Sequence, residues 1–593
     1  MDAELIGAPV LGVARSATGR RWIWRDAEPR IAAGIAQRLS LPELVGRLLA
    51  VRGVGIEAAS DWLDPTLRVL LPDPSVLSDM DAAAARIADA VERGETVGVF
   101  GDYDVDGACA GALMVRVLAA LGCEVLSHVP HRITEGYGPN VTALRTLAER
   151  GATLIVCVDC GIAASSVFAE LGGGSDIVVL DHHKAEGAVP SVVAVVNPNR
   201  LDDSSGLTGL CAAGVSFLAS VAVLRTLRRR GYFASRREPD LIGLLDLVAL
   251  ATVCDVMPLT GVNRALVSQG LKVMARRERP GIAALLEIAG VRDAPSAHSC
   301  GFALGPRINA AGRIDDPGLG LRLLTTDDPV EARALAEKLD AVNRQRQLVE
   351  ASMLEAALAQ ADAQAAAGHP AILVAGDGWH PGVVGIVAGR VKERLNRPAC
   401  VAAVTEGEAK GSGRSVPGLD LGAAIIAARQ AGILTSGGGH PMAAGFGLRA
   451  ERMAEFHAFL CERLSAASAL PAAADLPVEG TMAVAAATTD LAQMVGRLAP
   501  FGAGNEEPIF ALPRARVVRA DRVGREGNTV RAFVDAEEGG ARLKAILFRG
   551  REGPLAELLL NERGPVHLAG HLRCESWNGS ESACFVVADG VRV

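Results

Sequence analysis

The sequence predicts an α/β protein of several domains: a doubly wound parallel sheet, a long connecting helix, a second α/β domain and a C-terminal β-barrel. Three patterns predict this arrangement. Apolar runs alternate with alanine-rich helical stretches between about residues 82 and 200, residues 330–366 contain no proline or glycine, and short alternating runs follow about residue 516. A chain of 593 residues is also too long for one hydrophobic core.

The composition is that of a soluble globular protein, with 50% hydrophobic and 22% charged residues. A net charge of −8 argues against non-specific coating of nucleic acid, although a basic groove can still be local. The eleven cysteines have no framework spacing, and the first residues lack a basic-then-apolar signal pattern. We therefore expect a cytoplasmic protein with reduced thiols and no membrane association.

The first 80 residues predict a separate N-terminal cap. Trp22, Trp24 and Trp62 occur there together with several prolines, which suggests an irregular, partly helical segment. The parallel-sheet domain is expected at 81–329. Its candidate strands are 96–100, 124–129, 153–159, 176–181 and 193–196.

The first of these strands leads into three aspartates at alternate positions, Asp102, Asp104 and Asp106. Like charges this close repel one another unless a cation lies between them, and Mg²⁺ and Mn²⁺ prefer carboxylate oxygens. An EF-hand calcium loop begins similarly but needs a glutamate at its twelfth position, which here is Leu113. A solvated acidic turn fits poorly, because α/β folds bind ligands at this carboxyl edge of the sheet.

Further metal-type ligands follow other elements of the same domain. Asp159 ends the third strand, Asp181, His182 and His183 end the fourth, and Asp255 follows an apolar helix. A lone aspartate in such a place is more often a helix N-cap than a ligand, but the joint occurrence predicts one site. The expected metal ligands are Asp102, Asp104, Asp106, Asp159, His182 and Asp255.

Six ligands of this kind suit two Mn²⁺ or Mg²⁺ ions that share a bridging carboxylate. The mixture of aspartate and histidine disfavours a thiolate-type zinc site. Two such ions are a general device for displacement at phosphorus, so the residues predict metal-dependent cleavage of a phosphodiester. Arg132 and Tyr137 follow the second strand, where they can meet a phosphate and stack on a base, although a buried structural tyrosine is the alternative.

Residues 330–367 predict one long helix between two lobes. A second α/β domain is expected at 368–467, with glycine-rich segments at 378–390, 411–415 and 437–440. Glycines let backbone N–H groups approach a phosphate, so the three segments together predict a phosphate site. A single segment of this kind would more simply indicate a tight turn. The last region, 468–593, predicts short antiparallel strands in a small barrel.

Four segments in this order resemble the DHH phosphoesterase superfamily: GDYDVDG at 101–107, VDCG at 158–161, LDHH at 180–183 and ATVCDVMPL at 251–259. From about residue 80 onward, the chain resembles one branch of it, the bacterial exonucleases specific for single-stranded DNA. The resemblance implies that the parallel-sheet domain is a DHH domain, that the second α/β domain is a DHH-associated domain, and that the barrel is an OB-fold.

The resemblance also implies roles for the individual residues. Asp159 would bridge the two ions. Asp102 and Asp104 would bind one ion. Alternatively, Asp102 would support the other ligands without binding the ion itself. His183 would contact the scissile phosphate or protonate the leaving oxygen, and Asp181 would orient the imidazoles. The other ion would be held by Asp106, His182 and Asp255.

A second set of residues is expected to bind the DNA strand or its terminal phosphate. Those in the DHH domain are Arg132, Tyr137, Arg307, Asn309 and Arg313. Those in the DHH-associated domain are His380, Arg390, Ser412, Arg414, Ser415, Gly438, Gly439 and His440.

The implied function is 5′-to-3′ degradation of single-stranded DNA to mononucleotides in recombination and repair. A monomer is expected, with a single-strand-binding protein and a repair helicase as partners by family analogy. The runner-up is a DHH phosphodiesterase acting on short oligonucleotides or cyclic dinucleotides. A pyrophosphatase of the same superfamily is less favoured, because an inorganic substrate needs neither a barrel nor Tyr137. A non-enzymatic scaffold would lack metal ligands, and none is missing here.

Overall fold

The computed structural model describes eight stretches of the chain, and short parts of the predicted cap and barrel lie outside them. The described residues are 8–132, 134–184, 187–469, 474–524, 527–536, 539–548, 552–577 and 579–593. The chain forms two compact units. One contains residues 60–345 and 499–506, and the other contains residues 1–59, 346–498 and 507–593.

The first unit is built on a five-stranded sheet in the order β3-β2-β4-β5-β6, and every pairing is parallel. The strands are β2 (Thr96–Gly101), β3 (Val125–His128), β4 (Ala152–Val158), β5 (Asp176–Leu180) and β6 (Ala194–Val196). These bounds confirm the five strands predicted from the sequence.

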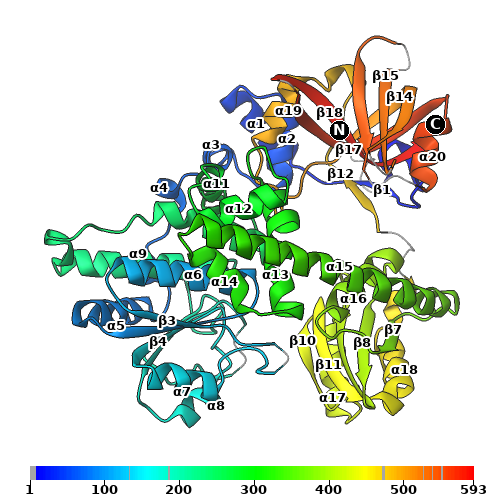
Figure 1. Cartoon of the computed structure of the whole chain (residues 1–593). Coiled ribbons are helices and arrows are strands. Elements are labelled where there is room, and N and C mark those ends of the chain that lie inside the picture. Colours follow the sequence, from blue (N-terminus) through cyan, green and yellow to red (C-terminus); the bar gives the residue numbers. More distant parts are fainter. Residues whose placement is uncertain are drawn as a thin grey trace. The chain divides into compact units, whose positions relative to one another are not determined.

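Helices cover both faces of this sheet (Figure 1). Along β4, Leu154 and Val156 belong to one core with α5, α6 and α9, whereas Ile155 and Cys157 belong to a second core with α7 and α8. The doubly wound arrangement is therefore confirmed. These helices are α5 (Met80–Arg93), α6 (Val105–Ala120), α7 (Val141–Glu149), α8 (Ser165–Leu171) and α9 (Ala212–Arg229).

A run of helices follows the sheet. The helices are α10 (Leu245–Cys254), α11 (Gly261–Ala275), α12 (Pro280–Ile288), α13 (Gly305–Ile314), α14 (Gly318–Thr325) and α15 (Pro329–Ala366). The α15 helix confirms the predicted connecting helix, and it leads from one unit into the other. No helix among the described residues combines the length and apolarity needed to cross a membrane.

The second α/β domain contains a mixed five-stranded sheet in the order β10-β11-β9-β8-β7, in which only β7 and β8 are parallel. The α16 helix packs on β8 and β9, and α17 and α18 share a core with Leu373 and Cys400. Its elements are β7 (Ile372–Asp377), α16 (Val384–Leu395), β8 (Ala399–Thr405), β9 (Glu408–Arg414), α17 (Leu421–Gln430), β10 (Ser436–His440), β11 (Ala443–Arg449) and α18 (Met453–Arg463).

The C-terminal strands form a barrel, because β14 pairs with both β15 and β17 and thereby closes the sheet. Two pairings correct the expectation of antiparallel strands: β13 pairs in parallel with β14, and β16 pairs in parallel with β18. The elements are β12 (Leu476–Val478), β13 (Gly480–Thr481), α19 (Thr489–Gly496), β14 (Phe510–Val523), β15 (Thr529–Ala536), β16 (Arg542–Leu547), α20 (Pro554–Asn561), β17 (Pro565–Trp577) and β18 (Ser580–Arg592).

Part of the predicted N-terminal cap packs with this barrel. The β1 strand (Trp22–Trp24) pairs in parallel with β12, and Nε1 of the fully buried Trp22 donates to Oδ2 of Asp589 at 3.0 Å. Residues 1–59 belong to the same compact unit as the barrel. The α-helices of the predicted cap are α1 (Pro29–Leu39), α2 (Glu43–Val51), α3 (Ala59–Leu63) and α4 (Leu67–Leu70).

Candidate metal centre

The loop after β2 is shaped by the start of α6. Asp104 is the N-cap of that helix, and its carboxylate accepts hydrogen bonds from N–H of Asp106 at 2.8 Å and of Gly107 at 3.0 Å. A β-carbon at position 107 would lie 2.4 Å from the carbonyl oxygen of Asp102. Only glycine fits there, so the loop can fold tightly enough to hold three aspartates together.

The Asp106 carboxylate caps a different helix. Its two oxygens accept from N–H of Ala212 at 2.6 Å and of Ala213 at 2.8 Å, at the N-terminus of α9. The side chain is almost fully buried, and burial raises its pKa despite these hydrogen bonds. The sheet and α9 therefore hold this carboxylate in a fixed orientation.

Asp159 lies directly after β4 in the left-handed backbone region, with φ of +59°. It is 2% exposed, and burial, followed by the charge of Asp106, raises its pKa well above the ordinary value. A non-glycine residue rarely adopts this backbone conformation without a compensating role. The turn directs its carboxylate toward the other acids.

His182 joins these acids in one cluster. Its Nε2 lies 3.3 Å from Asp159 Oδ1, 3.5 Å from Asp255 Oδ2 and 3.7 Å from Asp106 Oδ2. Two groups of ligand atoms, each within 4.8 Å, result from this geometry: Asp106 with His182 and Asp255, and Asp102 with Asp104 and Asp159. All six predicted ligands thus come together. Asp159 belongs to the second group and also lies 3.3 Å from His182 of the first.

The donor set fits divalent cations. Asp102 Oδ1, Asp159 Oδ1 and Asp255 Oδ2 are buried oxygens that make no hydrogen bond. Burial, followed by the charge of a neighbouring aspartate, raises the pKa of Asp102 and of Asp255 to about 8. Buried acceptors without donors are costly, and oxygen-rich sites select Mg²⁺ or Mn²⁺, so a cation would relieve both the desolvation and the repulsion.

His183 faces the same cluster from the next position. Its Nδ1 lies 2.8 Å from Asp181 Oδ1, and its ring contacts Tyr137 edge-on at 5.5 Å between centroids. The Tyr137 hydroxyl lies 3.2 Å from His183 Nε2 and donates to the carbonyl oxygen of Asp159 at 3.3 Å. Since Tyr137 is 52% exposed, it is not the buried structural tyrosine of the alternative interpretation.

Two asparagines that sequence reasoning missed hold the backbone of the two histidines. Asn199 Nδ2 donates to the His182 carbonyl at 2.6 Å, and Asn197 Nδ2 donates to the His183 carbonyl at 2.9 Å. The sequence contains a pattern that could have identified them, because Asn-Pro-Asn directly follows the last strand of the sheet, at the edge where the predicted ligands lie.

The predicted DNA-binding residues of this unit lie near the aspartate loop, but several are already engaged. The Arg132 guanidinium lies 5.4 Å from the Tyr103 ring centroid. On α13, Asn309 accepts from Val105 N–H at 3.2 Å, and Arg307 pairs with Asp340 at 2.9 Å. Asn309 therefore braces the loop. Arg313 lies in the last turn of α13.

In the second α/β domain, the strand register brings together most of the residues predicted to bind phosphate. Across β9, β11 and β10, Arg414 and His440 both lie opposite Ala443, and Ser412 and Gly438 both lie opposite Gly445. Residues in these two rows point to one face of the sheet. Gly439 lies between them in the backbone, opposite Ala444.

The start of α16 lies beside this row. A β-carbon at Gly385 would approach Ser412 Oγ and an Arg414 guanidinium nitrogen to 3.2 Å, so the helix and the two side chains are in close contact. A helix N-terminus next to an arginine is a suitable place for a phosphate. His380 precedes this helix, and its Nδ1 accepts from Gly382 N–H at 3.1 Å.

Two other residues expected to grip phosphate are occupied in the structure. Arg390 lies 3.6 Å from Glu350 and 3.5 Å from Glu393. Ser415 is 1% exposed and donates to the Leu419 carbonyl at 2.9 Å, so it holds the turn before α17. The remaining members of the set, on β9, on β10 and in the segment before α16, are better placed for a ligand.

The family models match this chain in three places. They are the N-terminal domain of the DHH family at 96–252, the DHHA1 domain at 368–466 and the RecJ OB domain at 478–589. The three matches correspond to the sheet domain, the second α/β domain and the barrel described above.

Similar proteins cover most of the chain. The single-stranded-DNA-specific exonuclease RecJ of Dickeya dadantii is 39% identical over 532 residues, covering 86% of this chain and 89% of that protein. RecJ of Bacillus subtilis is 32% identical over 583 residues, covering 97% and 71%. The crystal structure of RecJ in complex with Mn²⁺ from Thermus thermophilus matches with a TM-score of 0.79 at 30% identity, over 96% of this chain and 79% of that one. A Mg²⁺ complex of the same protein matches with a TM-score of 0.74.

Proposed function

The chain belongs to the RecJ family of single-stranded-DNA-specific exonucleases, and we propose from this premise that it is a metal-dependent exonuclease acting on single-stranded DNA. The predicted family is confirmed by the three domain matches and by the similarity along most of the chain. The observation that carries the proposal is the convergence of five aspartates and His182, in which three buried carboxylate oxygens make no hydrogen bond.

We assign two divalent cations, Mn²⁺ or Mg²⁺, to this centre. Asp159 would bridge them, since its carboxylate belongs to the group with Asp102 and Asp104 and its Oδ1 lies 3.3 Å from His182 Nε2 of the other group. When bound, such ions supply an activated water and neutralise charge on the attacking and leaving oxygens. The ligands proposed for one ion are Asp102, Asp104 and Asp159, and those proposed for the other are Asp106, Asp159, His182 and Asp255.

The protein itself would position the scissile phosphate and handle a proton. His183 carries a pKa raised to about 9, because its hydrogen bond with Asp181 and the charge of Asp181 outweigh the opposing effect of burial. It can therefore hold a proton at Nε2 near neutral pH and donate to a phosphate oxygen or to the leaving oxygen. The neighbouring Tyr137 hydroxyl limits the orientations of this imidazole.

Two sets of residues are proposed to contact the DNA, one in each compact unit. The exposed ring of Tyr137 offers a face to a base beside the metal centre, where Arg132 can meet a backbone phosphate. The row of Ser412, Arg414 and His440 next to α16 is proposed to bind the 5′-terminal phosphate. This role would account for a 5′-to-3′ polarity.

The test is degradation of single-stranded DNA labelled at the 5′ or the 3′ end, with Mn²⁺ and with a chelator. We expect early release of the 5′ label as a mononucleotide, late release of the 3′ label, slow cleavage of duplex, and no cleavage with the chelator. Early 3′ release would contradict the polarity, and equal cleavage of duplex would contradict the strand specificity. Binding without metal-dependent cleavage would favour the scaffold alternative.

The proposed 5′-phosphate site can be tested separately with Arg414→Ala. Loss of the guanidinium should raise KM for an oligonucleotide carrying a 5′ phosphate more than for one carrying a 5′ hydroxyl. A suitable control is Arg449→Ala, because Arg449 lies on β11 and pairs with Glu451 at the far end of the strand. Equal effects on both substrates would remove Arg414 from this role.

A phosphodiesterase acting on short oligonucleotides or cyclic dinucleotides is the alternative. It would share the metal chemistry but would not need the closed β14–β18 barrel. Comparing kcat/KM of the intact chain on a dinucleotide and on a long single strand separates the two functions. A role in recombination and repair, a cytoplasmic location, a monomeric state, and a single-strand-binding protein and a helicase as partners are further proposals that rest on the family.

A further inference from the structure

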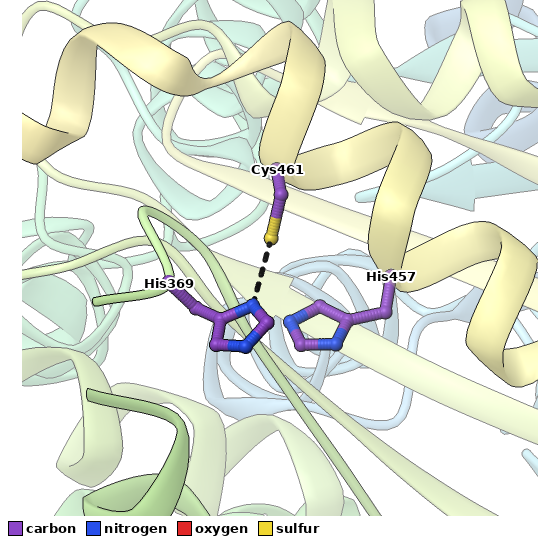
Figure 2. A group of neighbouring side chains, drawn as sticks. All are labelled: His369, His457 and Cys461. Carbon is purple, nitrogen blue, oxygen red and sulfur yellow. Dashed lines mark hydrogen bonds between the residues drawn. The ribbon is translucent and has the colours of Figure 1, made fainter. Parts of the chain in front are cut away.

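A second group of metal-type side chains lies in the DHH-associated domain. Figure 2 shows His369, His457 and Cys461 converging, with His457 and Cys461 on one helix and His369 on a neighbouring segment. The helix is α18, where a spacing of four residues places both side chains on the same face. His369 follows the end of α15 and precedes β7. None of these residues belongs to the carboxylate centre.

The distances within the group suit a single small ion. One ligand atom from each side chain lies within 4.8 Å of the others. Cys461 Sγ is 3.6 Å from His369 Nδ1. Two ligands of a tetrahedral zinc ion, at about 2.3 Å for sulfur and about 2.1 Å for nitrogen, lie about 3.6 Å apart. The sulfur and the imidazole nitrogen are thus already separated by the distance that a shared ion requires.

A backbone carbonyl completes the group. The oxygen of Ala371 lies 2.9 Å from His457 Nε2 and 3.6 Å from Cys461 Sγ. In the metal-free arrangement it accepts hydrogen bonds from these two side chains. When an ion binds, the Cys461 thiol releases its proton to solvent and the His457 proton lies on Nδ1, so the Ala371 oxygen becomes available as a fourth donor beside the two nitrogens and the sulfur. The two imidazole rings stack at 4.9 Å between centroids, so both are held in place before any ion enters.

The donor chemistry differs from that of the carboxylate centre. Sulfur and imidazole nitrogen are the ligands of Zn²⁺, whereas Mg²⁺ and Mn²⁺ prefer oxygen. No aspartate or glutamate belongs to this group, among the residues that the structure describes. One chain would therefore carry two sites that select different metals.

We propose that His369, His457 and Cys461 form a zinc-binding site, with the Ala371 carbonyl or a water as the fourth ligand. The ion would tie the segment after α15 to α18 and so fasten the start of the DHH-associated domain to its last helix. The site is structural, and it stands whether or not the nuclease activity is as proposed above.

Cobalt titration of the metal-free protein tests this site directly. Co²⁺ bound by a thiolate gives a near-ultraviolet charge-transfer band, which oxygen ligands do not produce, and excess Mg²⁺ keeps the carboxylate centre occupied. We expect one equivalent of Co²⁺ to give the band in the wild type, and Zn²⁺ to abolish it. Cys461→Ser should lose the band, and His369→Gln and His457→Gln should bind Co²⁺ at least about tenfold more weakly.

Cys574→Ser is the matched control, because Cys574 lies half-buried on β17 and belongs to none of the ligand groups among the described residues. It should keep the band at full intensity. Absence of the band in the wild type, or its persistence in Cys461→Ser, would overturn the proposal. If circular dichroism shows that Cys461→Ser does not fold, His369→Gln tests the proposal instead, because His369 lies outside the α18 helix. An unchanged Co²⁺ affinity of the His369→Gln variant would also exclude the site.

Discussion

Asp181 Oδ1 and His183 Nδ1 lie 2.8 Å apart, and this contact sets the protonation of the histidine. Asp181 is fully buried and also accepts backbone hydrogen bonds from Ile162, His182 and His183. Burial opposes its ionisation, but the hydrogen bonds, led by that of His183, hold its pKa below the usual value. An ionised carboxylate is therefore fixed behind the imidazole and raises the pKa of His183.

The first prediction concerns Asp181→Asn. An amide removes the negative charge behind His183, so the histidine pKa should fall from about 9 toward its ordinary value or below, because burial then dominates. We expect kcat to fall about 10- to 100-fold. The histidine pKa can be measured by NMR on metal-free protein with isotope-labelled histidine. An unchanged pKa would show that Asp181 does not control His183.

The second prediction concerns Asp159→Ala, which removes the proposed bridge. Cleavage of single-stranded DNA should fall by at least about 10³-fold, because both ions lose a shared ligand. The fold should persist, since the variant relieves buried charge repulsion. Circular dichroism and single-turnover kinetics check both expectations.

Asp176→Asn is the control for this variant. Asp176 begins β5 at the opposite edge of the same sheet and pairs with Arg86, away from the carboxylate cluster. It should retain nearly full activity. Comparable losses in both variants would point to a general effect of removing an acid, and undiminished turnover in Asp159→Ala would exclude the bridging role.

The third prediction is the pH dependence of stability without metal. Asp102 and Asp255 have pKa values raised from 3.8 to about 8, so the folded state binds protons that the unfolded state has released. Stability should therefore fall as pH rises between about 4 and 8. Mn²⁺ binds the ionised carboxylates, so its stabilising effect should grow over the same range. Thermal unfolding with Mn²⁺ or with chelator measures both trends.

Asp255→Asn provides the matched comparison for this effect. It removes one of the carboxyl groups whose pKa burial has raised, so the loss of stability with rising pH should be shallower in the chelator. A slope equal to that of the wild type would mean that the acid cluster does not control the pH dependence.

The fourth prediction separates the two parts of Tyr137. Tyr137→Ala removes the stacking face, so KM for single-stranded DNA should rise about 5- to 150-fold, as expected for about 1–3 kcal/mol of base stacking. Tyr137→Phe keeps the ring but loses the hydroxyl near His183, so it should lower kcat with little change in KM. If Tyr137→Ala lowers kcat and leaves KM unchanged, the residue acts in proton handling rather than in strand binding.

The clustering of the proposed metal ligands was predictable because these residues follow buried strands and one apolar helix. Parallel strands that are covered on both faces read as apolar runs, so the polar residue that ends each run stands out, as Asp159 does after β4. Since the carboxyl ends of parallel strands meet at one edge, the proposed ligands that follow strands were expected to lie together. Asp255, which follows the α10 helix, joins the same cluster.

Other features depend on contacts that leave no local pattern. The pairing of Arg307 with Asp340 and the burial of Ser415 follow from tertiary packing, and neither is visible in the glycine-rich segments that contain these residues. His369 and Cys461 are separated by most of the DHH-associated domain, so their approach could not be foreseen. The same holds for β1, whose short Trp-Ile-Trp run gives no hint of its partner strand.

That pairing has a consequence for how the protein is made. Trp22 lies beside Leu476, so β1 can pair with β12 only after more than 450 further residues have been synthesised. At about 5–20 residues per second, the delay is roughly 20–90 s. Throughout it a tryptophan destined for the interior remains in contact with solvent or with a chaperone. The β1 strand is thus among the last parts of the described chain to form its native contacts.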